Sequence, residues 1–278
     1  MEIETLHPNL HRILVPSPTL PPATTTNAWI TAKTGGMVVD PAANTPATQQ
    51  TLIDHLEEFQ PSAVFLTHHH HDHIGSAEIL RDHFNIPIIA HKRTDELIKF
   101  QVDHRIDEGH QFASGGDIWT AIHTPGHAPG HLCLISKADR SLIAGDMVAG
   151  EGTILINPTE GSIREYLRSL RRLRTFTPSR LLPAHGGALT NADALLQEYI
   201  VHRTNRLLQI WNLLSETPQS TLELARLIYT ELPAKYIGMA AIQVHCGLLF
   251  LEEDDAATQL LSKTSGWIRG HSDYSVTI

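Results

Sequence analysis

The chain has 278 residues and a mass of 30.8 kDa, a length that predicts either two domains or one large domain with an appendage. Its formal charge is −9, with 30 acidic against 21 basic residues, so the chain as a whole offers no field that attracts nucleic acid. Hydrophobic residues make up 41% and charged residues 18%, a composition that excludes fibrous and disordered proteins.

The N-terminal residues carry acids where a secretory or mitochondrial leader would carry bases. We find no uninterrupted apolar run of the roughly 20 residues that span a bilayer. Two widely separated cysteines, Cys133 and Cys246, suit a reducing compartment. We therefore expect a soluble, cytoplasmic protein that does not interact with membranes.

Short apolar segments alternate with helical patterns through the first part of the chain. Apolar runs bounded by Gly, Pro or Asn predict strands at 28–30, 36–39, 63–66 and 86–89. Apolar residues at helical spacing predict helices over 49–59 and 76–84. This alternation predicts a layered α/β architecture.

A second group of strands is expected at 118–122, 132–135 and 141–144, followed by a helix over 162–175. One face of this helix is apolar, and the other is rich in arginine: Arg164, Arg168, Arg171, Arg172 and Arg174. Such a face is typical of a solvated amphipathic helix. The alternative is a surface that binds an anionic substrate.

The pattern changes at Asn191, after which long helical stretches are expected at 192–214, 221–232 and 240–251, with a final hairpin around 263–269. We predict a catalytic domain over 1–190 and a mostly helical, winged-helix-like domain over 191–278. Six bases against ten acids give this second region a charge of −4, the wrong sign for phosphate binding. Closure of a substrate pocket or formation of a homodimer is the better expectation.

The run Thr67 to Gly75 reads T-H-H-H-H-D-H-I-G and follows the predicted strand 63–66 directly. Functional loops of α/β proteins lie at such strand ends. The interrupting Asp72-His73 pair selects His68 and His70 as alternating, same-side ligands, and Asp72 and His73 can face a neighbouring cation. The run therefore predicts one part of a site for two metal ions, although a single metal is the alternative.

One loop cannot surround two metals, so further ligands must come from elsewhere. Three candidates follow other predicted strands or stand among small residues: His127 in T-P-G-H, Asp146 in A-G-D and His185 in P-A-H-G. His131, four residues after His127, is expected either to orient a ligand or to contact substrate, or only to pack.

These four motifs, in this order, resemble the metallo-β-lactamase superfamily over about residues 10 to 190. The resemblance implies an αββα sandwich in which His68, His70 and His127 hold one zinc, Asp72, His73 and His185 hold a second, and Asp146 bridges both. It also implies that Asp40 supports the ligands from behind, and that Asn27 matches an asparagine found before the opening strand. Segments 145–153 and 199–206, with the C-terminal module, look like the β-lactamase-like endoribonuclease branch.

The sequence departs from two branches of that family. Many true β-lactamases use a cysteine at the second metal, where this chain has Asp146, as in glyoxalase II and the phosphodiesterases. The flavodiiron branch commonly has Glu at the second ligand position, where this chain has His70. Hydrolysis of antibiotics and reduction of oxygen are therefore not expected.

We expect an enzyme that holds two Zn²⁺ ions, with iron or manganese as alternatives, and that attacks an ester-type bond with hydroxide. Asp72 either accepts the proton of the attacking water or is only a ligand. A phosphodiester in short single-stranded RNA and a small-molecule thioester, as in glyoxalase II, are the two candidate substrates. A mononuclear iron persulfide dioxygenase and a non-catalytic binding protein are the alternatives to a hydrolase.

Overall fold

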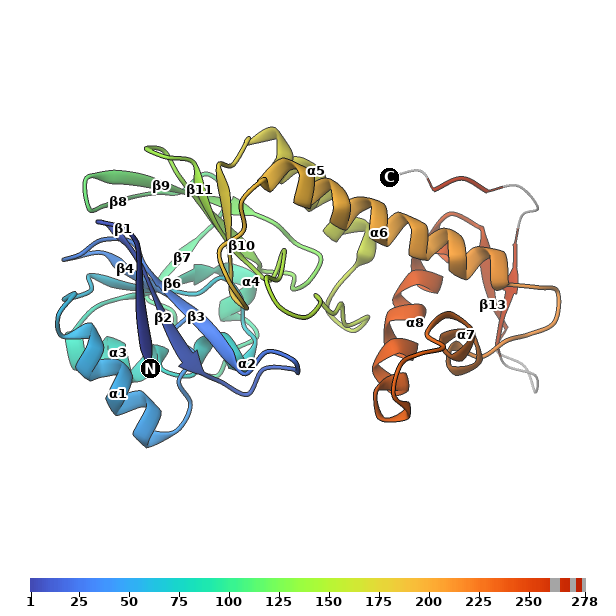
Figure 1. Ribbon diagram of the computed structural model, residues 1–278, viewed down its shortest axis with the longest axis horizontal. Helices are drawn as coiled ribbons and strands as arrows, with labels where there is room; N and C mark the ends of the chain where they lie inside the picture. The colour runs from blue at the N-terminus through green and yellow to red at the C-terminus, as the bar shows by residue number, and fades with distance from the viewer. Residues whose placement is uncertain (261–265, 271–273, 277–278) are drawn as a thin grey trace.

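Two β-sheets face each other in the first two thirds of the chain (Figure 1). The computed structural model describes residues 1–260, 266–270 and 274–276. The strands of the first sheet, in their spatial order, are β1 (Glu2–His7), β2 (Leu10–Pro16), β3 (Thr25–Ile30), β4 (Met37–Val39), β5 (Ala63–Phe65), β6 (Ile88–His91) and β7 (His104–Ile106). The second sheet runs β12 (Arg180–Pro183), β11 (Ser141–Gly145), β10 (Leu132–Ser136), β9 (Asp117–His123) and β8 (Gln111–Ser114).

Helices cover the outer face of each sheet, so the expected αββα sandwich is confirmed. The helices of this region are α1 (Pro46–Leu56), α2 (His71–Ile74), α3 (Ala77–Phe84), α4 (Lys92–Asp95) and α5 (Ile163–Thr175). One apolar cluster joins β2 to β6 with α1 and α3, a second fills the space between the sheets, and a third joins the other sheet to α5. Thr45 caps α1 through a reciprocal capping box, and Ser162 caps α5.

Parallel pairing of β4, β5 and β6 brings their carboxyl ends to one edge of the first sheet. The parallel pair β11 and β12 does the same in the second sheet. Since loops at the carboxyl ends of parallel strands meet in space, residues far apart in sequence converge here. This edge is where the candidate site lies.

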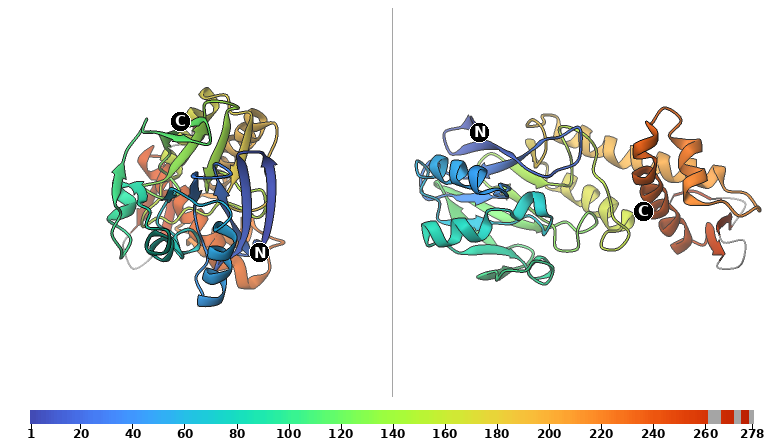
Figure 2. Two further views of the ribbon diagram at one scale, coloured as in Figure 1. Left: turned by 90° about the vertical axis from the view of Figure 1, so that its left-hand side faces the viewer. Right: turned by 90° about the horizontal axis from the view of Figure 1, so that it is seen from below.

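A helical region follows the sandwich and extends the molecule along its longest axis (Figure 2). Its elements are α6 (Ala192–Leu213), α7 (Thr221–Ile228), the short 3₁₀ turn Ala234–Tyr236, α8 (Ile237–Glu253), and the antiparallel pair β13 (Ala257–Leu260) and β14 (Gly266–Arg269). The hairpin predicted around 263–269 matches the structure only in its second strand, β14, because β13 lies before the predicted range; Lys263 lies outside the described residues. The winged-helix-like character of this region and the boundary at residue 190 remain predictions.

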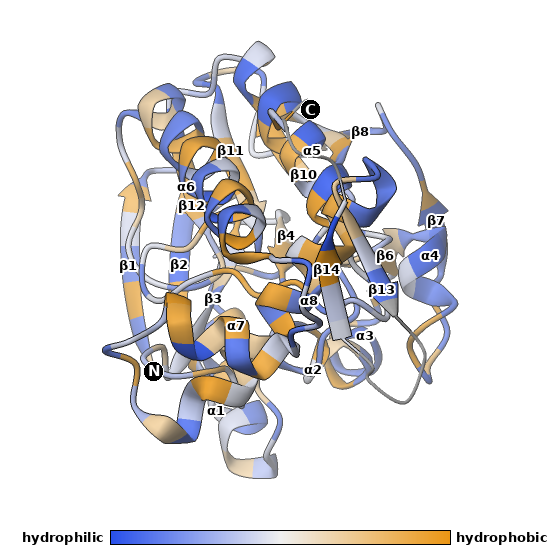
Figure 3. Ribbon diagram, turned by 90° about the vertical axis from the view of Figure 1, so that its right-hand side faces the viewer, coloured by the Kyte–Doolittle hydropathy of each residue, from blue (hydrophilic) through white to orange (hydrophobic). Residues whose placement is uncertain are grey.

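The segment Ala234–Glu253 is long enough and apolar enough to cross a membrane, with a mean hydropathy of 1.4. Its fully buried residues Val244, Leu248 and Leu251 pack in the same apolar cluster as α5 and α6. Figure 3 shows α7, α8 and β14 from this end of the molecule, with apolar residues on both helices. One side of this segment is therefore covered by α5 and α6.

Candidate metal centre

The histidine run begins directly after β5 and enters α2, so its side chains lie at the sheet edge. His68 and His73 are fully buried, whereas His70 is half-buried and His71 is exposed. The loop before β10 brings His127 beside them: His127 Nε2 lies 3.3 Å from His68 Nε2 and 3.0 Å from His70 Nδ1. His68 Nε2 and His70 Nδ1 are also 3.0 Å apart. Three ring nitrogens therefore converge on one point.

The outer nitrogen of each ring has its own hydrogen-bond acceptor. His70 Nε2 donates to Glu160 Oε1 at 3.1 Å, and His127 Nδ1 donates to a backbone carbonyl at 2.8 Å. His68 Nδ1 donates to Thr67 Oγ1 at 2.9 Å, because the Thr67 hydroxyl hydrogen is itself directed to a carboxylate. These bonds select the tautomer of each neutral ring in which the converging nitrogen carries no proton.

Converging lone pairs without a proton between them repel one another unless a cation lies at their centre. Zinc bound tetrahedrally at about 2.1 Å holds its ligands about 3.4 Å apart, close to the spacing of these nitrogens. Asp146 Oδ2 supplies a fourth donor, 3.3 Å from His127 Nε2. His68, His70, His127 and Asp146 thus fit a metal ion in donor type, spacing and protonation.

A second donor group lies on the other side of Asp146 and consists of Asp72, His73 and His185. His73 Nδ1 donates to Asp40 at 2.9 Å and His185 Nδ1 donates to a backbone carbonyl at 3.0 Å, so in the neutral tautomer of each ring Nε2 carries no proton. His185 Nε2 lies 3.6 Å from Asp72 and 3.5 Å from Asp146, and His73 Nε2 lies 3.8 Å and 3.7 Å from the same carboxylates. His73 Nε2 and Asp146 Oδ1 are buried without a hydrogen-bond partner, as expected of metal ligands.

Burial and charge set the protonation of the site. Burial lowers the pKa of His68 well below its ordinary value and lowers the pKa of His127 to about 4. Burial opposes a charge on His73 as well, but Asp146, Asp40 and Asp72 outweigh it and raise the His73 pKa. Burial would raise the pKa of Asp146, yet the surrounding histidines hold it well below its usual range. The Asp146 carboxylate is therefore ionised at neutral pH.

Asp40 connects the two donor groups from behind. Its carboxylate accepts hydrogen bonds from Thr67 N at 2.8 Å, from Thr67 Oγ1 at 2.7 Å and from His73 Nδ1 at 2.9 Å. Thr67 Oγ1 in turn accepts from His68, so one carboxylate fixes a histidine of each group. Asp40 itself has a φ of 54°, a conformation that ordinary residues rarely adopt.

His131 lies outside both donor groups and supports Asp146. Its Nε2 accepts a hydrogen bond from the backbone N–H of Asp146 at 3.0 Å, and its Nδ1 donates to Thr124 Oγ1 at 2.8 Å. The preceding residue must be glycine: Gly145 has a φ of +49°, and a Cβ atom there would lie 2.5 Å from His131 Nε2. Of the alternatives for His131, the geometry matches the one in which it orients a ligand.

Asn27 holds the loop that carries His185. Its Nδ2 donates to the carbonyls of Pro183 and Gly186, both at 2.8 Å, on either side of that histidine. The residue is fully buried in β3, so the two sheets are joined by these bonds next to the site.

Glu160 is the site residue that sequence reasoning missed. It accepts hydrogen bonds from His69 Nε2 at 2.7 Å and from His70 Nε2 at 3.1 Å, and these bonds lower the Glu160 pKa well below its ordinary value. It stands 90 residues from His70 in a loop before α5, where no motif marks it. His69, which the sequence left outside the ligand set, helps to hold this carboxylate.

Replacing Glu160 with glutamine should weaken metal binding, because a glutamine oxygen can accept from only one of the two histidines. We expect affinity for the metal held by His68, His70 and His127 to fall about 10- to 100-fold. Competition with a fluorescent zinc chelator would measure it. Glu165→Gln makes the same charge change on the exposed face of α5 and should keep the affinity of the unmodified protein. Equal affinities for the two variants would show that Glu160 does not position His70.

Another His/Asp cluster lies apart from the site and consists of His91, Asp107 and His123. His91 Nδ1 accepts from the backbone N–H of Arg93 at 3.1 Å, so its Nε2 carries the proton and is not a ligand. The Asp107 carboxylate is bound by Lys92 Nζ at 2.9 Å. Unlike the main site, this cluster does not fit a metal ion.

Both donor groups open into one groove of about 1310 Å³. Its walls come from the loop 18–23, the region of α2 and α3, the segment 97–100, the loop 149–160 and α8. The metal donors at its floor include Asp72, His127, Asp146 and His185. A substrate whose reacting bond lies at the metal donors would therefore extend through the groove between the sandwich and α8.

Comparison with known proteins agrees with this geometry. A family model described as the metallo-beta-lactamase superfamily matches residues 21–185. The chain is 29% identical over 258 residues to "Lactamase-like protein vrtG" of Penicillium aethiopicum, which covers 86% of this chain and 80% of that protein. It is 24% identical to "Probable metallo-hydrolase YqjP" of Bacillus subtilis (strain 168) over 70% of this chain and 76% of the relative.

Two solved structures extend the comparison. A beta-lactamase domain protein from Burkholderia ambifaria superposes with a TM-score of 0.86 at 20% identity, covering 97% of this chain and 94% of that one. TTHA1623, solved in a di-iron-bound form, superposes with a TM-score of 0.52 at 25% identity over 64% of this chain and 96% of that protein. The superposition with the Burkholderia ambifaria protein includes the helical region after the sandwich.

Proposed function

Since the chain belongs to the metallo-β-lactamase superfamily, we propose that it is a metal-dependent hydrolase that binds two metal ions and cleaves an ester-type bond. The observation that carries this proposal is the set of ring nitrogens that converge on two adjacent points with Asp146 between them, while the other nitrogen of each ring is hydrogen-bonded elsewhere. Zinc suits the mixture of imidazole and carboxylate donors, and iron and manganese are the alternatives.

When bound by these residues, two metal ions would lower the pKa of a water molecule to near neutrality and would polarise the oxygen of the scissile group. The protein's own residues would hold the ions and accept the proton of the attacking water. His68, His70, His127, His73 and His185 present fixed lone pairs, while Asp40, Glu160 and backbone carbonyls keep the ring protons away from the metals. Asp72 lines the groove, and its neighbours His73 and His185 outweigh burial and lower its pKa. An ionised Asp72 is therefore available as a ligand and as an acceptor for the proton of the attacking water.

The lining of the groove beyond the metal donors supports a carbonyl ester or thioester over a phosphodiester. Its acidic lining residues are Asp72, Glu78, Asp146, Glu151 and Glu160. Among the described lining residues, Lys99 alone is a lysine or arginine. Single-stranded RNA is held by basic grooves and stacked aromatic rings, whereas the described lining offers one lysine, Lys99, and one phenylalanine, Phe100.

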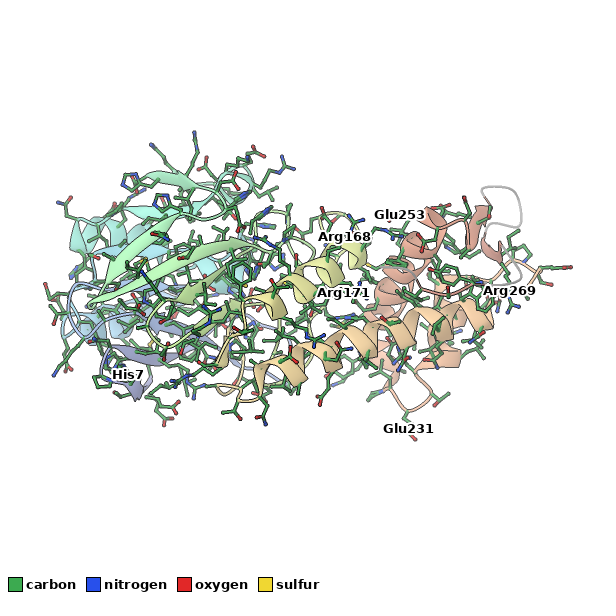
Figure 4. The ribbon with its side chains drawn as sticks, turned by 90° about the horizontal axis from the view of Figure 1, so that it is seen from above. His7, Arg168, Arg171, Glu231, Glu253 and Arg269 are labelled. Atoms are coloured by element: carbon green, nitrogen blue, oxygen red, sulfur yellow. The ribbon has the colours of Figure 1, made fainter. Side chains whose placement is uncertain are left out.

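The arginine-rich face of α5 does not change this conclusion. Arg164 pairs with Glu253 and Asp254, and Arg174 pairs with Asp193. Arg172 pairs with Glu108, and none of the five arginines is among the described groove residues. Figure 4 shows Arg168 and Arg171 on α5, beside α6. Arg164, Arg172 and Arg174 therefore join separate segments of the chain, and none of the five arginines of α5 lines the groove as described.

The test is metal content beside a substrate panel. The purified chain, loaded separately with zinc, iron and manganese, would be assayed for metals per chain and for hydrolysis of an acetyl thioester and a single-stranded RNA oligonucleotide. We expect two metals per chain and thioester hydrolysis that a chelator abolishes. RNA cleavage without thioester turnover would make the protein a phosphodiesterase. One iron per chain, with oxygen consumed in the presence of a persulfide, would make it a dioxygenase.

A further inference from the structure

Apolar side chains are exposed at the groove, where a soluble protein would ordinarily cover them. The exposed large apolar residues of the described chain are Leu20, Ile79, Leu97, Val201, Leu222, Leu227 and Ile242. Four of these seven, Leu20, Ile79, Leu97 and Ile242, line the groove. They come from four separate segments, so the chain gathers apolar surface around one opening. Partly buried Ile98, Phe100 and Met239 extend the same lining.

The wall formed by α8 is fixed to the metal site. Gln243 Nε2 donates to the carbonyl of Ile156 at 2.9 Å, and Gln243 Oε1 accepts from its N–H at 3.1 Å. Within the same short segment, the carbonyl of Leu155 accepts from the Nδ1 of His127 at 2.8 Å. Ile242, adjacent to Gln243, is therefore held at a set position relative to a metal donor. An apolar group contacting α8 can remain in place while its other end lies at the metals.

Three features of the groove restrict its substrate: the lining carries exposed apolar side chains, its described residues include one lysine and no arginine, and it is continuous with the metal donors. We propose that the substrate is an ester or thioester with a long apolar acyl group, and that this acyl group lies against Leu20, Leu97 and Ile242. The C-terminal helical region thereby selects substrate by supplying α8 as a wall. This inference rests on the proposed hydrolase function and adds the chemical class of the acyl part.

The test uses N-acetylcysteamine thioesters with acyl chains from two to twelve carbons. We expect kcat/KM to rise about two- to fourfold per methylene until the apolar lining is filled. In Ile242→Asn the ratio of kcat/KM for the decanoyl over the acetyl thioester should fall about tenfold. Val201→Asn is the matched control, because Val201 is 44% exposed against 46% for Ile242, also lies on a helix, and is not a groove residue. It should keep the ratio of the unmodified enzyme.

A second measurement separates this inference from the hydrolase proposal. The S-decyl thioether of N-acetylcysteamine cannot be hydrolysed, and calorimetry would measure its binding to the metal-loaded protein. Tight binding that Ile242→Asn weakens and Val201→Asn does not, with no thioester hydrolysed, would support the apolar groove and overturn the hydrolase. Thioester hydrolysis that does not depend on chain length, with no binding of the thioether, would support the hydrolase and overturn the apolar acyl group.

Discussion

Asp146→Ala should lose at least one metal ion per chain and nearly all hydrolytic activity. Asp146 lies within 3.3 to 3.7 Å of histidines from both donor groups, and its Oδ1 is buried without a hydrogen-bond partner. Because metal ions contribute several kcal/mol to stabilising the transition state, we expect kcat/KM to fall by at least about 10³-fold. Plasma emission spectrometry would give the metal count, and thioester turnover would give the rate.

The control must separate loss of metal from loss of folding. Asp54→Ala removes an exposed carboxylate from α1 and should keep both metals and full activity. Asp146→Asn keeps one ligand oxygen and should fall between the alanine variant and the unmodified enzyme. Far-ultraviolet circular dichroism would show that each variant is folded. If Asp146→Ala kept two metals and full activity, the bridging assignment would be wrong.

The candidate donor residues could be proposed from the sequence because each stands in a short motif next to a strand. The segments before His68 and Asp146 are fully buried apolar strands, β5 and β11, and a buried strand that ends in polar residues is a local signal. The layered α/β fold could be predicted because short apolar strands alternate with helical patterns along the sequence. Parallel pairing then brings the strand ends together without further information.

The residues that the sequence did not reveal act over long separations or through irregular backbone. Glu160 reaches His70 from a loop, and the groove wall on α8 approaches the site only through tertiary packing. Strand β1 was not predicted because it pairs only with β2 and is half-exposed, so its pattern lacks a continuous apolar run. Helix α7 ends at Ile228, earlier than the predicted residue 232, because the chain turns before Pro233.

Both donor groups depend on Asp40, which holds a histidine of each group through hydrogen bonds. In Asp40→Asn one carboxylate oxygen becomes an amide nitrogen that donates hydrogen bonds. If this amide takes the place of Oδ2, His73 Nδ1 must accept instead of donate, and its proton moves to Nε2, the atom directed at Asp72 and Asp146. A protonated Nε2 cannot bind a metal. We therefore expect affinity for the second metal to fall about 10- to 100-fold and activity to fall with it.

Asp117→Asn provides the matched comparison for Asp40→Asn. Asp117 accepts hydrogen bonds from the backbone N–H groups of Ile118 and Ala138 and from the hydroxyl of Ser136, so it too is an aspartate with three donors, but it lies outside the groove lining. Both variants should lower the melting temperature, because each loses charge-assisted hydrogen bonds. Only Asp40→Asn should also lower metal affinity, and excess zinc should restore part of its activity. Equal metal affinities in the two variants would mean that the Asp40 carboxylate stabilises the fold without setting the tautomer of His73.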